Sequence, residues 1–94
     1  MSGEVYVGDY GLPIEYTVTS GLSIAELAAA TITMTVTKAD GSTVTKAATV
    51  SNLVISCMVD TGWHSVPGRY TAQPSIVLAG LHKRLDAAYY TVYP

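Results

Sequence analysis

The sequence predicts an all-β protein, an immunoglobulin-like antiparallel β-sandwich of about seven strands with one short helical turn. The first observation is the run over residues 30–38, where apolar side chains alternate with threonines, as in a strand with one buried and one wet face. The second is the Asp40-Gly41 turn that follows this run. The third is the recurrence of turn signals about every ten residues. An open barrel is the alternative architecture.

The first third of the chain predicts two strands and a helical turn. The strands cover residues 4–9 and 12–19, with a glycine-containing turn between them, and Ser20-Gly21 ends the second strand. Glu26 follows Ser23 by three residues, which is the capping-box pattern of a helix start. Alanine and leucine continue the pattern for one or two turns before the strand over residues 30–38.

Two further strands are expected over residues 42–51 and 52–60, the first of which pairs back across the Asp40-Gly41 turn. Val54 and Met58 make the outer face of the second strand partly apolar, which suits a central or contacted strand. The inward phase of these strands defines the expected core: Ile32, Met34, Val36, Leu53, Ile55, Cys57 and Val59. Cys57 is the only cysteine, so it forms no internal disulfide, and we interpret it as a small core residue rather than a reactive thiol.

The last third predicts a connection over residues 61–68 and two strands over 69–78 and 82–93, with Pro74 interrupting the first strand. Tyr89 and Tyr90 are adjacent in the last strand, so they point to opposite faces and one of them lies outside the core. No linker, repeat or low-complexity tract divides the chain, and we expect a single domain over residues 1–94.

Composition restricts the possible partners. The chain is 49% hydrophobic and 13% charged, so either a partner covers a sheet face or Thr, Ser and Gly keep the surface soluble. With a net charge of −2, five Lys and Arg and no basic stripe, binding to nucleic acid is not expected. No apolar run approaches the ~20 residues of a membrane span. No signal peptide is recognisable at the start.

No pattern of an enzyme is present, so we expect a non-enzymatic protein with no metal and no cofactor. His64, His82 and Cys57 lack the spacing of metal ligands, and neither a nucleophile motif nor a phosphate-binding loop occurs. Trp63, beside His64, has three possible roles: a plug over the open end of the sandwich, an anchor for a protein partner, or a platform for a sugar.

Several segments resemble the immunoglobulin-like N-terminal domain of phage baseplate upper proteins, a module also found in tail, neck and head-associated virion proteins of tailed phages. The likeness is carried by residues 8–13 (GDYGLP), the helical turn and Thr/Val strand over 27–36, Asp40-Gly41, residues 67–70 (PGRY) and the closing strand. The chain departs from the family at residues 78–81 (LAGL), where the family usually has an Asp-Gly turn.

The resemblance implies a structural protein of a tailed-phage virion, made in the host cytoplasm. It would bind other virion proteins at the neck, tail, baseplate or capsid surface, as a homo-oligomer or in several copies. A carbohydrate-binding or host-surface adhesion module is the alternative, and a small hydrolase a more distant one. We expect the contact at a strand edge or on the face bearing Val54 and Met58. It should include whichever of Tyr89 and Tyr90 points outward, and Trp63 is a weaker candidate.

Overall fold

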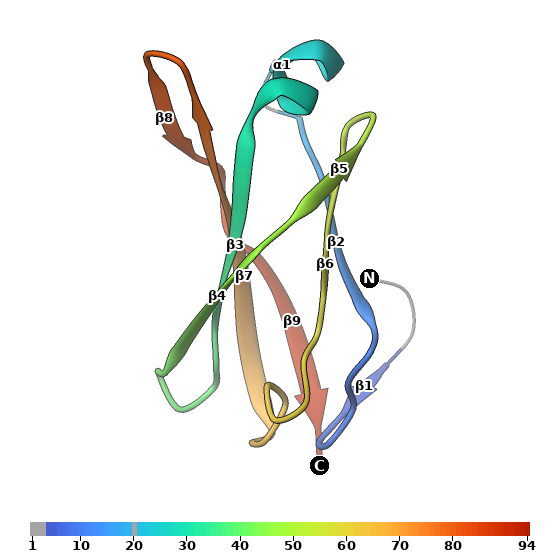
Figure 1. Cartoon of the computed structure of the whole chain (residues 1–94). Coiled ribbons are helices and arrows are strands. Elements are labelled where there is room, and N and C mark those ends of the chain that lie inside the picture. The colour runs from blue at the N-terminus through green and yellow to red at the C-terminus, as the bar shows by residue number, and fades with distance from the viewer. Residues whose placement is uncertain (1–3, 20) are drawn as a thin grey trace.

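A computed structural model describes residues 4–19 and 21–94 and folds them into two packed β-sheets, with a short helix across one end (Figure 1). The larger sheet has the order β1-β9-β7-β3-β4, and β8 also pairs with β7; the smaller sheet has the order β2-β6-β5. The elements are β1 (Val5–Tyr6), β2 (Pro13–Thr17), α1 (Ile24–Ala29), β3 (Thr31–Thr37), β4 (Thr43–Ala47), β5 (Thr49–Ser51), β6 (Val54–Met58), β7 (Gly68–Leu78), β8 (Leu81–Arg84) and β9 (Ala88–Tyr93).

The strand order confirms the immunoglobulin-like sandwich predicted from the sequence. Strands β2, β6 and β5 take the places of B, E and D in that fold, and β3, β7 and β9 take those of C, F and G. A tyrosine corner supports the assignment, because buried Tyr70 at the start of β7 donates a 2.6 Å hydrogen bond to the carbonyl of Val66.

Nine strands form among the described residues rather than about seven, because two expected strands are each divided. The segment over 42–51 changes sheets at Ala48, so β4 belongs to the larger sheet and β5 to the smaller. The segment over 82–93 divides into β8 and β9. The sheets are also not wholly antiparallel, because β1 pairs parallel to β9 with Val5 opposite Val92. Ser20, expected at the end of the second strand, lies outside the described residues.

Pro74 explains where the last strand divides. It does not interrupt β7, as the sequence suggested, but lies buried within it opposite Met34 of β3. Its carbonyl accepts a 3.0 Å hydrogen bond from Leu85 N–H. The ring nitrogen of Pro74, which has no hydrogen to donate, points to the same side as this carbonyl, toward the gap between the end of β8 and the start of β9. The Gln73 side chain donates to the Leu85 carbonyl at 2.9 Å and satisfies the backbone at this break.

The core lies between the sheets, and most of the residues predicted for it are buried. Ile32, Met34, Val36, Ile55, Cys57 and Val59 are all confirmed. The prediction for Leu53 was wrong, since this residue is 36% exposed. Asn52, with φ +54°, turns the chain between β5 and β6, so Leu53 belongs to the turn and does not follow the alternation of β6.

The two predicted local signals are also confirmed. Ser23 and Glu26 form a reciprocal capping box at the start of α1, and Leu27 of this helix is buried in the core. At the Asp40-Gly41 turn, Gly41 adopts φ +91°, and an oxygen of the Asp40 carboxylate accepts a 2.9 Å hydrogen bond from Ser42 N–H.

The corrected position of Leu53 can be tested by mutation. Ile55→Ala empties a fully buried site and should lower the free energy of unfolding by about 2–5 kcal/mol. Leu53→Ala, two residues away in an exposed turn, should cost less than about 1 kcal/mol. Urea unfolding followed by tryptophan fluorescence measures both values. Equal losses would mean that Leu53 packs in the core after all.

Candidate functional site

The outer face of the larger sheet gathers an unusual set of side chains. The period of two that buries one side of β3, β7 and β9 turns the other side outward, and the register aligns these outward residues across the sheet. Thr35, for example, lies between Gln73 of β7 and Thr45 of β4. We call this surface the threonine–tyrosine face: Thr31, Thr33, Thr35, Thr37, Thr43, Thr45, Ala47, Arg69, Thr71, Gln73, Ser75, Val77, Tyr89, Thr91 and Tyr93.

This face is almost without charge. Over β4, β3, β7 and β9 it holds eight of the twelve threonines of the chain but only one of its twelve Lys, Arg, Asp and Glu residues, Arg69. Arg84 of β8 lies beside the face, opposite Ser75. The Arg69 guanidinium lies 4.1 Å from the centre of the Tyr89 ring, within the range of a cation–π contact. Natural surfaces normally carry many interspersed charges, so a neutral sheet face of this extent is a candidate contact surface.

Tyrosines concentrate at one end of the face. Tyr89 is 60% exposed, and Tyr93 further along β9 is also exposed. The parallel pairing of β1 with β9 brings Tyr6 beside Tyr93, with 6.0 Å between the ring centres. A tyrosine gives a large, rigid contact area, and its hydroxyl can still form a hydrogen bond when the ring is buried. These rings are therefore suited to anchor a protein contact.

The five residues predicted for an interface do not form one site. Val54 and Met58 lie together on the outer face of the smaller sheet, and Met58 is 48% exposed. Tyr89 is the outward member of its pair and lies on the opposite sheet, whereas Tyr90 points inward opposite Tyr70. The prediction that one of the two tyrosines lies outside the core is thus confirmed for Tyr89.

Trp63 closes one end of the sandwich. It is 7% exposed and belongs to the buried core, which agrees with the plug interpretation. The Lys46 ammonium lies 5.9 Å from the centre of the indole ring and forms a 2.8 Å salt bridge with Asp60. So little of the Trp63 ring is accessible that it offers no stacking surface to a sugar and no anchor to a protein.

His64, next to Trp63, forms a buried cluster with two tyrosines, which the sequence analysis did not predict. His64 Nε2 lies 2.9 Å from the Tyr90 hydroxyl, and the ring packs edge-on against both Tyr70 and Tyr90. His64 Nδ1 has no hydrogen-bond partner among the described residues. Burial lowers the pKa of His64, an effect that the backbone and charge of Asp9 oppose and that Lys38 reinforces. The imidazole is therefore held neutral.

The described residues also bear on two other kinds of functional feature, a metal site and a membrane span. Among these residues, no three His, Cys, Asp or Glu side chains group as metal ligands would. Burial raises the pKa of the Cys57 thiol, which agrees with its interpretation as a small core residue. Of the helices in residues 4–19 and 21–94, none has the length and apolar character of a membrane span. The threonine–tyrosine face is thus the strongest candidate for a functional surface.

Comparison of the chain with protein-family models, with curated proteins and with solved structures found no match.

The buried state of His64 predicts acid sensitivity. The pKa of His64 is lowered in the folded protein. The contribution of His64 to the free energy of unfolding is therefore fully present above the unfolded pKa of about 6.5 and is lost as the pH falls below that value. His64→Gln should cost about 1–2 kcal/mol at pH 8, since it disturbs the hydrogen bond to Tyr90. It should also flatten the decline of melting temperature between pH 7.5 and 5. Parallel pH profiles for the two proteins would contradict this role of His64.

Proposed function

We propose that this chain is a non-enzymatic structural protein of a tailed-phage virion that binds neighbouring virion proteins through its threonine–tyrosine face. The virion setting rests on the family resemblance of residues 8–13, 27–36 and 67–70. The use of this face rests on one observation, the near absence of charge across four adjacent strands. The proposal needs no metal and no cofactor.

The chemistry of the face suits burial against another protein. Removing a charged side chain from water costs several kcal/mol unless a partner compensates it, whereas threonine and tyrosine carry only hydroxyls that can form new hydrogen bonds. Arg69 is the exception, and its guanidinium already lies against the Tyr89 ring. Tyrosine and arginine are enriched at the energetic centres of interfaces, so this pair is the expected anchor.

The size of the face favours repeated contacts over a single tight one. Four strands spaced about 4.8 Å apart and about 23 Å long give a footprint of about 450 Å² on each partner. The total of about 900 Å² lies below the roughly 1,200 Å² at which specific stable interfaces begin. A contact of this size becomes effective when several copies engage at once, as in a symmetric particle.

Incorporation into particles tests the proposal. The gene for this chain would be deleted from a tailed phage that encodes it, and variants would be supplied from a plasmid. Gradient-purified particles would then be analysed by quantitative mass spectrometry. The wild type should be present at a constant stoichiometry. Thr35→Glu, at the centre of the face, should reduce incorporation at least about tenfold, because it buries an uncompensated charge. The variant should still fold, since only an outward side chain changes.

Thr17→Glu is the matched control, because it adds the same charge at an exposed position on the outer face of the smaller sheet. It should be incorporated like the wild type. Exclusion of Thr17→Glu with normal incorporation of Thr35→Glu would move the contact to the face bearing Val54 and Met58. Absence of the wild-type chain from purified particles would contradict the virion role itself.

A further inference from the structure

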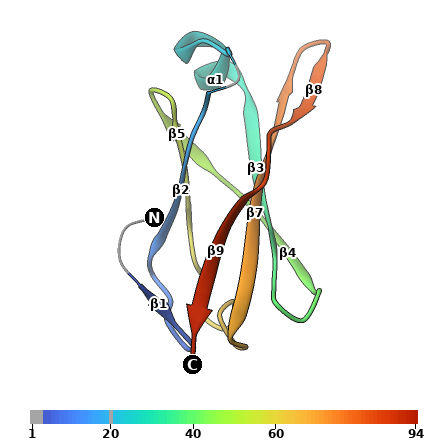
Figure 2. The same cartoon turned by 180° about the vertical axis from the view of Figure 1, so that it is seen from behind.

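A second surface lies on the free edge of the hairpin formed by the end of β7 and β8, next to Ser75 and Val77 of the threonine–tyrosine face. β8 pairs with residues 75–78 of β7, whereas β9 pairs with residues 68–72, so the hairpin extends past the part of β7 that β9 covers. Figures 1 and 2 show it projecting beside α1 at the end opposite the C-terminus. Gly80, with φ +75°, allows its tight turn.

β8 is an open strand edge. One of its edges pairs with β7, and the other pairs with no strand in the described part of the chain. All four of its residues are exposed. Such an edge carries unpaired backbone donors and acceptors that can accept another extended chain as an added strand.

The charge on this edge is positive and has no partner within the described residues. Lys83 and Arg84 are two of the five basic residues of the chain, and His82 precedes them. Among the described residues the single salt bridge is that of Lys46 with Asp60, so neither Lys83 nor Arg84 has an acid within 4.0 Å. Two uncompensated cations on an open edge, in a chain of net charge −2, form a local surface of opposite sign to the whole protein.

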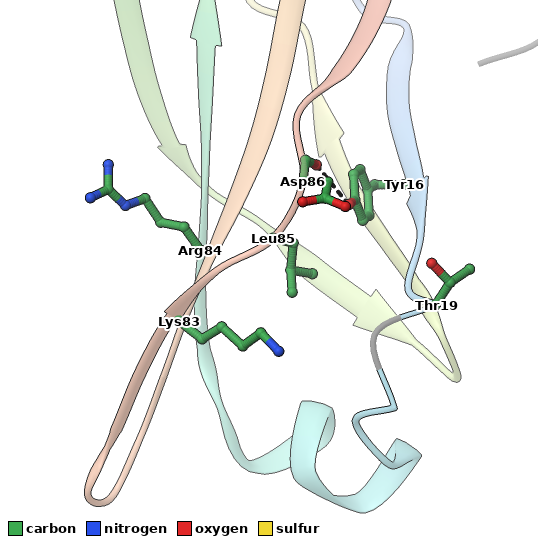
Figure 3. A pocket seen from close by; sticks show the side chains of 6 residues that line it. All are labelled: Tyr16, Thr19, Lys83, Arg84, Leu85 and Asp86. Carbon is green, nitrogen blue, oxygen red and sulfur yellow. Dashed lines mark hydrogen bonds between the residues drawn. The ribbon is translucent and has the colours of Figure 1, made fainter.

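A pocket of about 240 Å³ adjoins this edge at the break between β8 and β9 (Figure 3). Buried Leu85 lines it, and Tyr16 donates a 2.7 Å hydrogen bond to the Asp86 carbonyl across it. The side chains of Lys83 and Arg84 line the same pocket and extend to different sides of the strand (Figure 3). An acidic side chain of a bound segment that reaches the pocket along β8 would lie near Lys83 or Arg84. Deeper in the pocket, the Asp86 carboxylate would repel it.

We propose that β8 accepts an acidic extended segment of another protein as an added strand. Main-chain pairing supplies the alignment, and carboxylates of the incoming segment pair with Lys83 and Arg84. Charge decides between the possible occupants. A second copy of β8 would bring like charges together and is disfavoured. A nucleic acid would find too few cations for phosphate neutralisation to give strong binding. An acidic polypeptide can pair with the free backbone groups of β8 and also neutralise Lys83 and Arg84.

The proposal does not depend on the function of the threonine–tyrosine face, because the open edge belongs to β8, outside the strands that define that face, and because this edge is positively charged rather than neutral. It can hold for a protein that is not part of a virion, and it can fail while the virion role stands.

The test uses the ¹⁵N-labelled full chain and three probes: a ten-residue peptide of alternating Glu and Val, the same peptide with Gln for Glu, and a ten-nucleotide oligothymidylate. The acidic peptide should shift the amide signals of Leu81–Arg84 and those of the facing end of β7. Lys83→Gln together with Arg84→Gln should weaken its binding about tenfold, as expected for the loss of two ion pairs. Raising the salt concentration from 50 to 300 mM should weaken it similarly.

Ser51→Glu together with Thr61→Glu is the matched control, because it lowers the net charge by the same two units at exposed positions outside the hairpin. It should bind the acidic peptide as the wild type does, and thermal melting verifies that both double variants are folded. Equal binding of the Glu and Gln peptides, or signal shifts confined to other strands, would overturn the proposal. Tighter binding of the oligothymidylate than of the acidic peptide would also overturn it and assign the edge to phosphate recognition.

Discussion

The pairing of β7 with its neighbours is the constraint on which the rest of the structure depends. This strand pairs with β3 on one side and with β8 and β9 on the other, so three strands take their register from it. Its inward residues Tyr70, Ala72, Pro74 and Ile76 are all buried, and its outward residues form the middle of the threonine–tyrosine face. One alternation therefore determines the core and the candidate site together, and a shift of register by one residue would exchange them.

The two proposed surfaces follow from how this chain distributes its few charges. Most charged residues lie in turns, at the ends of strands or on the smaller sheet, and the centre of the larger sheet has none but Arg69. The threonines there favour the extended backbone and keep a neutral face hydrated until a partner replaces the water. Lys83 and Arg84, in contrast, lie on an edge where charge discourages pairing with a second copy. The first surface is thus suited to broad neutral contacts and the second to a partner of opposite charge.

The sequence predicted the fold class, the capping box at Ser23 and most of the core, because these features depend on local periodicity. It did not predict that Leu53 lies outside the core, because the alternating pattern continues through Asn52 and Leu53 and gives no sign that these two residues form a turn. The sequence predicts that Pro74 interrupts its own strand, but in the structure it lies opposite the break between β8 and β9. That break can be located only once the neighbouring strands are assigned. For the same reason the sequence places Val54 and Tyr89 in one expected interface, although the two residues lie on opposite sheets. The threonines over residues 31–37 were identified as a wet face, but only the alignment of β3 with β4, β7 and β9 reveals how far that face extends.

Hydroxyl-radical footprinting of the free chain and of the assembled particle tests the central claim most directly, because each sheet carries an exposed reactive side chain. Tyr89 reports on the threonine–tyrosine face and Met58 on the outer face of the smaller sheet. If the larger sheet makes the contact, assembly should lower the oxidation rate of Tyr89 several-fold and leave that of Met58 nearly unchanged. Protection of Met58 with an unchanged rate for Tyr89 would contradict the account.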